Sequence, residues 1–199
     1  MVITPKTREK ILDQAESLLQ DRGYNGFSYA DIAAPMKIKN AAIHYHFPTK
    51  AELGLAVIQR YRARLKSYSE HLNAKYGDDV LRLLDGFIAI PRSFLSKGEL
   101  GCPLGKLEAD ASNLPKDMHK ATVLLGNEMW QWLTLILERG QKQKIFKFTG
   151  PARDKALLIT VAVQGASLMA VMQNHSIFNA TVKQLKRDLG IQQQDKSGK

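Results

Sequence analysis

A long stretch without charged side chains constrains the fold of this chain more than any other feature. No Asp, Glu, Lys or Arg occurs between Ala156 and Val182, and much of the segment is apolar. About 18 apolar residues in a row are the lower limit for a membrane-spanning helix, but Thr160, Gln164 and Ser167 interrupt this run. We therefore expect a helix buried in a bundle or a dimer interface, and no membrane partner.

The charge balance favours an anionic partner. The chain of 199 residues carries 29 Lys and Arg against 19 Asp and Glu, a formal net charge of +10. Residues 1–66 contain 11 basic and 6 acidic residues, and the remaining 133 residues contain 18 and 13. Each part carries a net charge of +5, so the net charge per residue is about twice as high in the first part. Nucleic acid is a natural partner for such a surface, although a well-solvated basic protein without one would show the same balance.

Cysteine content and the N-terminal sequence indicate the compartment. Cys102 is the single cysteine, so no intrachain disulfide is possible, and the first residues contain no apolar signal core. Both features predict a cytoplasmic protein.

Helix start and stop signals recur along the chain, and no strand pairing is apparent. Thr4 and Pro5 combine a cap with a proline at the first helical position, and Gly23 follows the first apolar helical pattern as a stop signal. With 44% hydrophobic residues the chain is long enough for one domain or two small ones. The sequence predicts an all-α fold of about nine helices. The expected ranges are roughly 5–22, 28–36, 40–47, 50–74, 78 or 79 to 96, 103–112, 116–142, from 151 through the apolar segment, and 180–189.

The N-terminal region predicts a helix-turn-helix unit, because two short helices joined by a tight turn follow the first helix. The apolar positions Ile32, Ala33, Met36, Ile38 and Ile43 are expected to face inward. The third helix would then present small and polar side chains outward. These are Lys39, Asn40, Ala41, Ala42, His44, Tyr45 and His46.

That outward set suits the major groove of DNA. An asparagine such as Asn40 forms two hydrogen bonds with adenine, and alanines allow close approach and contact with thymine methyl groups. Tyrosine, histidine and Lys50 reach phosphate oxygens. Ser28 and Tyr29 open the second helix, whose free N–H groups form a phosphate site. His44 and His46 point about 200° apart on a helix, so we expect no shared metal site and no cofactor.

Residues 8–53 resemble the DNA-binding region of the TetR family of bacterial transcriptional regulators. The resemblance rests on Arg8, residues 11–19, Gly23-Tyr24, Ser28, Ile32-Ala33 and above all the segment AAIHYHFPTKAEL. It implies base contacts by Asn40, Ala41, Ala42, His44 and Tyr45, and phosphate contacts by Ser28, Tyr29, His46 and Lys50. It also implies a DNA-binding domain over residues 1–50, a ligand-binding and dimerisation domain over 51–190, and a polar tail over 191–199.

Three positions depart from the family pattern. Lys37 stands in the turn where glycine is usual, and a lysine at positive φ is strained. Pro35 interrupts the second helix, because it cannot donate a hydrogen bond to the Asp31 carbonyl. Lys39 replaces the small hydroxyl residue that usually caps the third helix. These differences put the detailed docking pose in question rather than the DNA-binding assignment.

The resemblance implies a small-molecule effector pocket between the middle helices. Effector binding would shift the long helix after Lys50 and change the distance between the two DNA-binding domains of a dimer. Aromatic and sulfur-containing side chains of the C-terminal part serve either as core or as pocket lining. The candidates are Phe87, Phe94, Met118, Met129 and Trp130, together with Cys102.

Cys102 precedes Pro103 at the expected start of a helix. Free N–H groups at a helix N-terminus stabilise a thiolate, which predicts a redox- or electrophile-sensing cysteine. The alternative is a small buried apolar residue. A thiol enzyme that uses Cys102 with the distant His119 or His175 is a further alternative, but no recognisable catalytic motif occurs, and we expect no enzyme activity.

Small residues on the apolar helix favour a close helix–helix contact. We expect Ala162, Gly165, Ala166 and Ala170 to form a homodimer interface, because a palindromic operator requires a two-fold symmetric protein. The sequence thus predicts a repressor released from its operator by a small molecule or by modification of Cys102. The alternative for the charge pattern is a general nucleic-acid binder, which would lack sequence selectivity.

Overall fold

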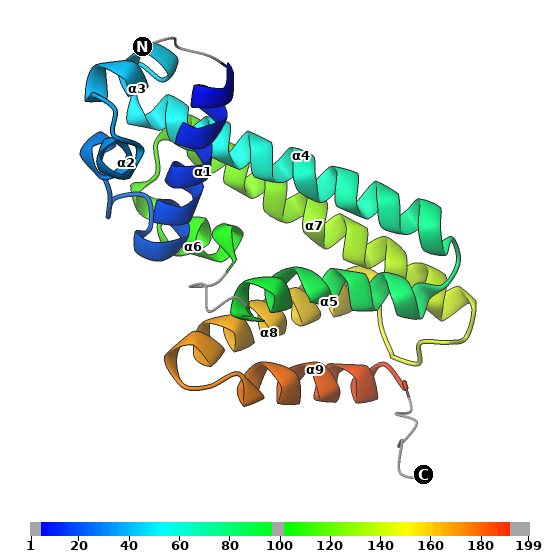
Figure 1. Cartoon of the computed structure of the whole chain (residues 1–199). Helices are drawn as coiled ribbons and strands as arrows, with labels where there is room; N and C mark the ends of the chain where they lie inside the picture. The colour runs from blue at the N-terminus through cyan, green and yellow to red at the C-terminus, as the bar shows by residue number, and fades with distance from the viewer. Residues whose placement is uncertain (1–4, 97–101, 192–199) are drawn as a thin grey trace, which may run out of the picture. The chain divides into compact units, whose positions relative to one another are not determined.

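The computed structural model describes residues 5–96 and 102–191, and within these ranges the chain forms nine α-helices, one short 3₁₀ helix and no β-strand (Figure 1). The prediction of an all-α fold with about nine helices is confirmed. The expected cap Thr4 and residues 192–199 of the expected tail lie outside the described residues.

Most helix boundaries agree with the sequence-based prediction. Helix α9 begins at Ser176, before the expected residue 180, and α6 ends at Ala109 where a longer helix was expected. In chain order the elements are α1 (Pro5–Arg22), α2 (Tyr29–Met36), α3 (Asn40–His46), α4 (Lys50–Tyr76), α5 (Val80–Ser96), α6 (Pro103–Ala109), η1 (Ala111–Asn113), α7 (Lys116–Lys142), α8 (Ala152–Met172) and α9 (Ser176–Asp188).

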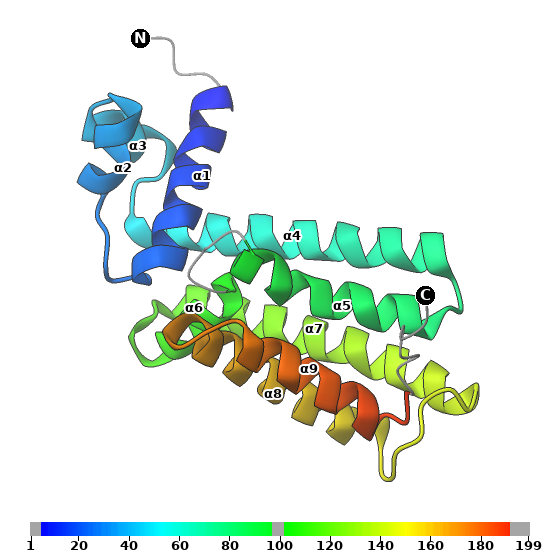
Figure 2. The same ribbon diagram turned by 60° about the horizontal axis from the view of Figure 1, so that its bottom comes forward.

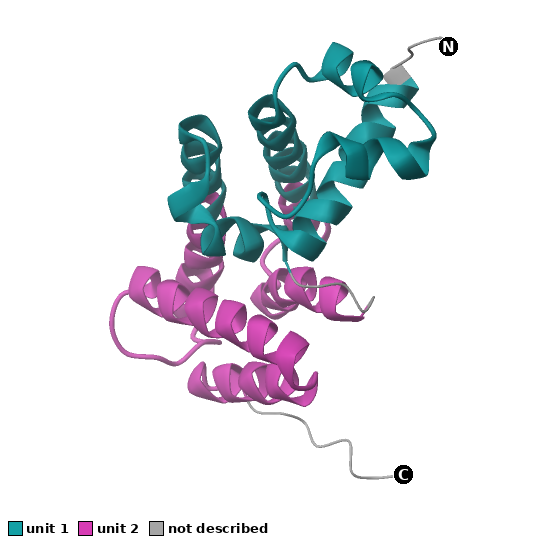
Figure 3. Ribbon diagram, turned by 90° about the vertical axis from the view of Figure 1, so that its left-hand side faces the viewer, with its two compact units in different colours: residues 1–68, 99–126 teal, residues 69–98, 127–199 magenta. Residues whose placement is uncertain are grey.

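The chain divides into two compact units (Figure 3). Unit 1 comprises residues 1–68 and 99–126, and unit 2 comprises residues 69–98 and 127–199. Helices α4 and α7 therefore contribute residues to both units. The functional division that the sequence predicts near residue 50 stays a prediction.

In unit 1, α1 packs against α2, α3 and α6 (Figure 2). Helices of seven or eight residues such as α3 and α2 are too short to be stable alone in water, so buried apolar contacts must hold them. Each fully buried Leu or Ile side chain contributes roughly 1.5–3 kcal/mol. The buried side chains include Ile11, Leu12, Ala15 and Leu19 of α1, Ile32 of α2, Ile43 of α3, and Leu53 of α4.

A charged network joins α1 to α4 within unit 1. Arg60 donates to Glu16 at 2.7 Å and to Asp13 at 2.8 Å, and it lies 3.4 Å from the carboxylate of Glu9. Arg64 pairs with the other carboxylate oxygen of Glu16. The side chains of Glu16 and Arg60 are only 11% and 18% exposed, so solvent screens this pair less than an ordinary surface ion pair.

The turn between α2 and α3 closes around a lysine in the left-handed conformation. Lys37 has φ 53° and ψ 41°. Its N–H donates to the Ala34 carbonyl at 3.1 Å, and the N–H of Ile38 donates to the Ala33 carbonyl at 3.2 Å. This pair of bonds is the Schellman motif, which normally uses glycine. The turn therefore keeps the usual geometry despite the lysine, and α2 continues one residue past Pro35 before it ends.

In unit 2, α8 packs against α9 and α5. Ala156, Ile159 and Val163 are buried on one side of α8, whereas seven large apolar side chains of the same helix are exposed. Among the described residues, α8 alone is long and apolar enough to cross a membrane, with a third of its apolar window buried. The exposed residues are Leu157, Leu158, Val161, Leu168, Met169, Val171 and Met172.

Candidate DNA-binding surface

Helix α3 buries one apolar side chain and turns small and polar ones outward. Ile43 is fully buried, as expected, while Lys39, Asn40, Ala41 and His44 are exposed. Tyr45 is 71% exposed, so most of its side chain is available to a ligand. Ala42 is half-buried.

The expectation that His46 faces outward is wrong. His46 is half-buried, its ring contacts Tyr45 and Phe47, and its Nε2 is buried without a hydrogen-bond partner. The reason is helical geometry, because His46 lies three residues after Ile43 and so shares its inward face. Within the described ranges, no group of three or more His, Cys, Asp or Glu residues is placed to hold a metal ion.

The N-terminus of α2 is closed by a capping box with an aspartate. The Ser28 N–H donates to the Asp31 carboxylate at 2.8 Å, and the Ser28 hydroxyl donates to the same oxygen at 2.7 Å. These hydrogen bonds lower the pKa of Asp31. The sequence pattern Ser28-x-x-Asp31 is a loose form of this box, with Asp in place of Glu or Gln, and both of its halves are present.

Lys50 does not extend into solvent as expected. Its ammonium donates to the Phe27 carbonyl and lies 4.7 Å and 4.4 Å from the ring centres of Tyr24 and Phe27. Burial lowers the pKa of Lys50, and the nearby charge of Asp31 acts in the opposite direction. Cation–π attraction and packing of the methylene stem explain this position. The half-buried charge therefore lies beside the residues that precede α2, at the wall of an open pocket.

Tyr29 is likewise used inside the protein. It is buried, and its hydroxyl donates to the Phe47 carbonyl at 2.7 Å. Burial, followed by the charge of Glu52, raises the pKa of Tyr29 to about 12. Its side chain is thus a link between the start of α2 and the end of α3, and only its backbone N–H remains a candidate for phosphate.

His44 is held in one orientation by two contacts. Its ring meets the Tyr29 ring edge-on at 4.6 Å, and its Nδ1 lies 3.2 Å from the Pro48 carbonyl. A carbonyl accepts only, so Nδ1 carries the proton. This leaves Nε2 as the nitrogen available to a ligand.

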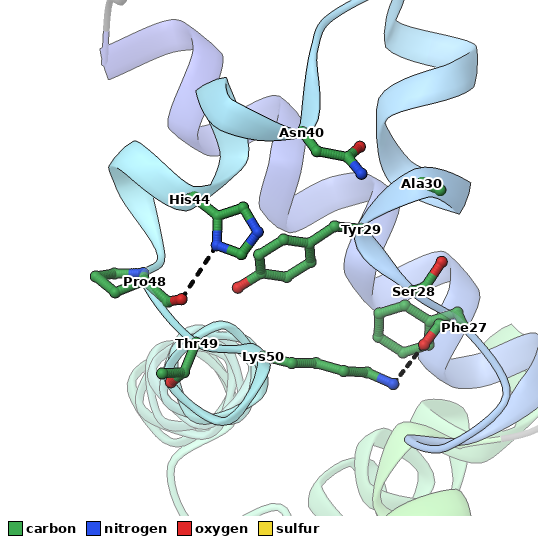
Figure 4. A pocket seen from close by; sticks show the side chains of 9 residues that line it. All are labelled: Phe27, Ser28, Tyr29, Ala30, Asn40, His44, Pro48, Thr49 and Lys50. Atoms are coloured by element: carbon green, nitrogen blue, oxygen red, sulfur yellow. Dashed lines mark hydrogen bonds between the residues drawn. The ribbon is translucent and has the colours of Figure 1, made fainter.

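An open pocket of about 480 Å³ brings these elements together (Figure 4). Sequence reasoning did not single out its members Phe27, Ala30, Pro48 and Thr49, although the run Phe47-Pro48-Thr49 was recognised as a motif. The Thr49 hydroxyl accepts the Glu52 N–H at 3.2 Å and so caps α4. The pocket is lined by Phe27, Ser28, Tyr29, Ala30, Asn40, His44, Pro48, Thr49 and Lys50.

The sequence and fold match one family of regulators. The family model described as bacterial regulatory proteins of the tetR family matches residues 11–57. The crystal structure of a TetR-family transcriptional regulator from Agrobacterium tumefaciens is 31% identical, with a TM-score of 0.87, and the match covers 92% of this chain and 98% of that one. This chain belongs to the TetR family.

Further relatives agree with this assignment. The transcriptional repressor NemR of Escherichia coli K12 is 26% identical over 166 residues, which are 82% of this chain and 83% of NemR. A TetR regulator from Legionella pneumophila is 27% identical, with a TM-score of 0.81 over 95% of this chain and all of that one. The chain is therefore a DNA-binding transcriptional regulator of the TetR family.

The six effector candidates of this TetR-family chain are divided between its units. Met118 is buried in unit 1, where a Cβ on Gly54 would meet its terminal atoms. Phe87 is buried in unit 2 against Trp132, at 5.5 Å between ring centres. Trp130 donates its indole N–H to the Arg153 carbonyl at 3.0 Å. Phe94 and Met129 are half-buried in unit 2.

Cys102 caps α6 in unit 1, and its environment opposes the expected activation of the thiol. Burial raises the pKa of Cys102, although the Tyr61 hydroxyl and the N–H groups of Leu104 and Gly105 act to lower it. The Tyr61 oxygen lies 3.4 Å from the Cys102 sulfur. Desolvation raises the pKa of the thiol by more than the N–H groups at the helix N-terminus lower it, so the expectation of a lowered pKa is wrong.

The four expected dimer residues lie on different sides of α8. Ala166 and Ala170 are buried inside unit 2, because they belong to the side that packs on the other helices. Gly165 is exposed, and a Cβ there would meet nothing within 4 Å. Ala162 is half-buried. Only Gly165 thus lies fully on the exposed apolar face.

Proposed function

We propose that this TetR-family regulator is a cytoplasmic homodimeric repressor that binds a palindromic operator and is released by a small-molecule effector or by modification of Cys102. The observation that carries the DNA-binding part is the pocket in which the α2 N-terminus, Asn40 and His44 converge beside the exposed face of α3. A groove that offers backbone N–H groups next to polar side chains suits a phosphate flanked by base edges.

The described residues suggest a division of roles. Asn40, Ala41 and Tyr45 are the exposed side chains of α3 that we assign to base edges. The first N–H groups of α2 are assigned to phosphate. The free Nε2 of His44 is a hydrogen-bond acceptor, because Nδ1 carries the proton, and is assigned to a donor group on a base edge. Lys50 lines the same pocket and adds positive potential beside the helix start, while one of its three N–H donors is bonded to the Phe27 carbonyl.

A homodimer is supported by α8. Seven of the thirteen exposed large apolar side chains among the described residues belong to this helix. Leu157, Val161, Gly165, Leu168 and Met172 follow each other at spacings of three or four residues, so they form one stripe. Exposed apolar stripes of this kind are typical of protein interfaces, and the glycine in its middle allows a second helix to approach closely.

The DNA-binding proposal is tested by selection of genomic fragments with the purified protein in excess non-specific competitor. We expect a palindrome, with operator affinity that falls steeply with salt. Asn40→Ala should weaken binding and relax selectivity by about 1–3 kcal/mol at one base position. Lys39→Ala should reduce the slope of log binding constant against log salt concentration, here called the salt slope, by about one. The matched change Lys183→Ala on α9 should leave the salt slope unchanged. Binding that disappears with competitor would instead support a general nucleic-acid binder.

The dimer is tested by sedimentation at micromolar concentration. Val161→Glu places a charge in the middle of the α8 stripe and is expected to give monomers that bind the operator weakly. Leu81→Glu, a similar change at an exposed leucine of α5, is the control and should remain dimeric. A wild-type monomer would contradict the proposal.

Small molecules and thiol reagents test the release step. We expect at least one compound that lowers operator affinity without unfolding the protein. A thiol enzyme is disfavoured, because the hydrogen-bond partner of Cys102 is Tyr61, and no histidine that could act as a base contacts the sulfur in the described structure.

A further inference from the structure

The carboxylate of Asp110 connects α6 to the turn that leads into the DNA-binding helices. Asp110 follows α6, and its Oδ2 accepts the Tyr24 N–H at 2.8 Å. Next to this bond, Gly23 has φ +73°, and a Cβ on Gly23 would lie 2.6 Å from the same oxygen. The contact joins residues 86 positions apart in the sequence, and both belong to unit 1.

Hydrogen bonds from distant parts of the chain fix the turn between Gly23 and Phe27 at two points. Asp110 holds the Tyr24 N–H at its beginning, and the Lys50 ammonium holds the Phe27 carbonyl at its end. The side chains of Tyr24 and Phe27 are both buried. The next residue, Ser28, caps α2 and lines the DNA-binding pocket. Asp110 thus acts on the start of α2 without being part of the pocket.

Helix α6 is suited to carry a displacement to this point. It is seven residues long, which is about 10 Å at 1.5 Å per residue. Pro103, Leu104, Gly105 and Leu107 are buried, and α6 packs against α1. Asp110 directly follows the last residue of α6, so a shift of α6 would also displace the Asp110 carboxylate.

We propose that Asp110 is a positioning residue for operator binding, through which the position of α6 sets the orientation of α2 and α3. This inference rests on the proposed function. When the Tyr24 N–H is bonded to Asp110, the turn is ordered before DNA is met. When α6 moves away, the turn loses one of its two fixed points, and binding must then order it at a cost in free energy.

Two substitutions at the same position separate the hydrogen bond from the charge. Asp110→Ala removes the acceptor, and we expect operator affinity to fall about 10-fold, the lower end of the effect of losing a hydrogen bond to a charged group. Asp110→Asn keeps an acceptor oxygen and should bind about as tightly as the wild type. The salt slope should stay unchanged in both, because no phosphate contact is lost.

The control is Glu108→Ala. Glu108 is an exposed acidic residue two positions before Asp110. Loss of a negative charge alone should leave DNA affinity unchanged or raise it slightly. Weaker operator binding by Asp110→Ala, together with wild-type binding by Glu108→Ala, therefore supports the positioning role of Asp110. Equal affinity of Asp110→Ala and the wild type, or equal weakening in both alanine variants, overturns the proposal. If Asp110→Ala does not fold, Asp110→Glu replaces it, since its longer carboxylate is crowded against Gly23 and should also weaken binding.

Hydrogen exchange tests the same contact without DNA. We expect faster exchange of the amides of residues 24–28 in Asp110→Ala than in the wild type, and near wild-type exchange in Asp110→Asn. Unchanged exchange in the folded alanine variant overturns the proposal. If the wild type selects no operator, the proposed function fails, while this measurement still decides whether Asp110 orders the turn.

Discussion

Lys37 offers a direct measurement of backbone strain in the helix-turn-helix. Its φ of 53° and ψ of 41° place a residue with a Cβ in the left-handed region, which costs roughly 1–2 kcal/mol for an L-residue. Its side chain is exposed. Glycine removes this cost but loses more conformational entropy on folding, about 0.5–1 kcal/mol relative to alanine. We therefore expect Lys37→Gly to be more stable than Lys37→Ala by roughly 0.5–1 kcal/mol.

The comparison of two variants that both lack the lysine charge isolates the backbone contribution. The assay is urea unfolding followed by circular dichroism at one fixed protein concentration, because association also changes apparent stability. Thermal midpoints should differ by about 1–4 °C in the same direction for a chain of this size. Lys144, which has φ 59°, should show the same order of stability.

Lys10 supplies the opposite control. It is exposed within α1, where glycine costs about 1 kcal/mol relative to alanine. Lys10→Gly should therefore be less stable than Lys10→Ala. If glycine were also the less stable choice at Lys37, the lysine would carry no left-handed strain, and the reasoning would be refuted.

Three further predictions concern the ion-pair network and two titratable groups. Arg60→Met removes one of the two arginine partners of Glu16 and should lower the free energy of unfolding in urea by roughly 1–3 kcal/mol. Adding Glu16→Gln should restore part of that stability. An Arg60→Met variant as stable as the wild type would contradict the stabilising role of the network. Burial raises the pKa of Cys102 above its ordinary 9.0, so alkylation of the folded protein by iodoacetamide should be slower than alkylation of the urea-unfolded protein. Its rate should still increase with pH above 9.0, and Tyr61→Phe should lower the rate further. A rate that reaches its plateau below that pH would disprove the raised pKa. The Asp31 pKa is lowered from 3.8 in the folded protein, so its stabilisation is present above that pH and lost as the pH falls through the folded pKa. The stability difference between wild type and Asp31→Asn should therefore be constant near neutral pH and shrink below pH 3.8, and a difference that persists in acid would argue against it.

Local signals predicted the helices well, because they act over a few residues. The Ser28–Asp31 capping box rests on short-range hydrogen bonds that the order of residues encodes, and α7 begins at Lys116, directly after Pro115, as the sequence predicts. The start of α9 lies earlier than predicted, although Asn174 is a residue type that commonly caps helices. The Asn174 side chain accepts the Ser176 N–H at 3.0 Å.

Side-chain directions in the candidate site were predicted less well. Lys50 and Tyr29 were expected to meet phosphate, but both bond to backbone carbonyls inside the unit. His46 was expected outside and shares the face of Ile43. A polar side chain bonds to the partner that packing brings near, and for Lys50 and Tyr29 that partner comes from another segment of the chain.

The sequence by itself determined that the chain is helical, that its N-terminal part is a helix-turn-helix of the TetR type, and that the segment after Pro151 must bury an apolar surface. The helices and the apolar segment follow from periodicity, caps and composition, whereas the TetR type follows from the resemblance of residues 8–53 to that family; both are read along the chain. Only the tertiary structure decided that the Cys102 thiol is desolvated and that Asp110 holds Tyr24 across 86 residues. Desolvation and long-range hydrogen bonds depend on which segments meet in space, and no local pattern of residues encodes that meeting.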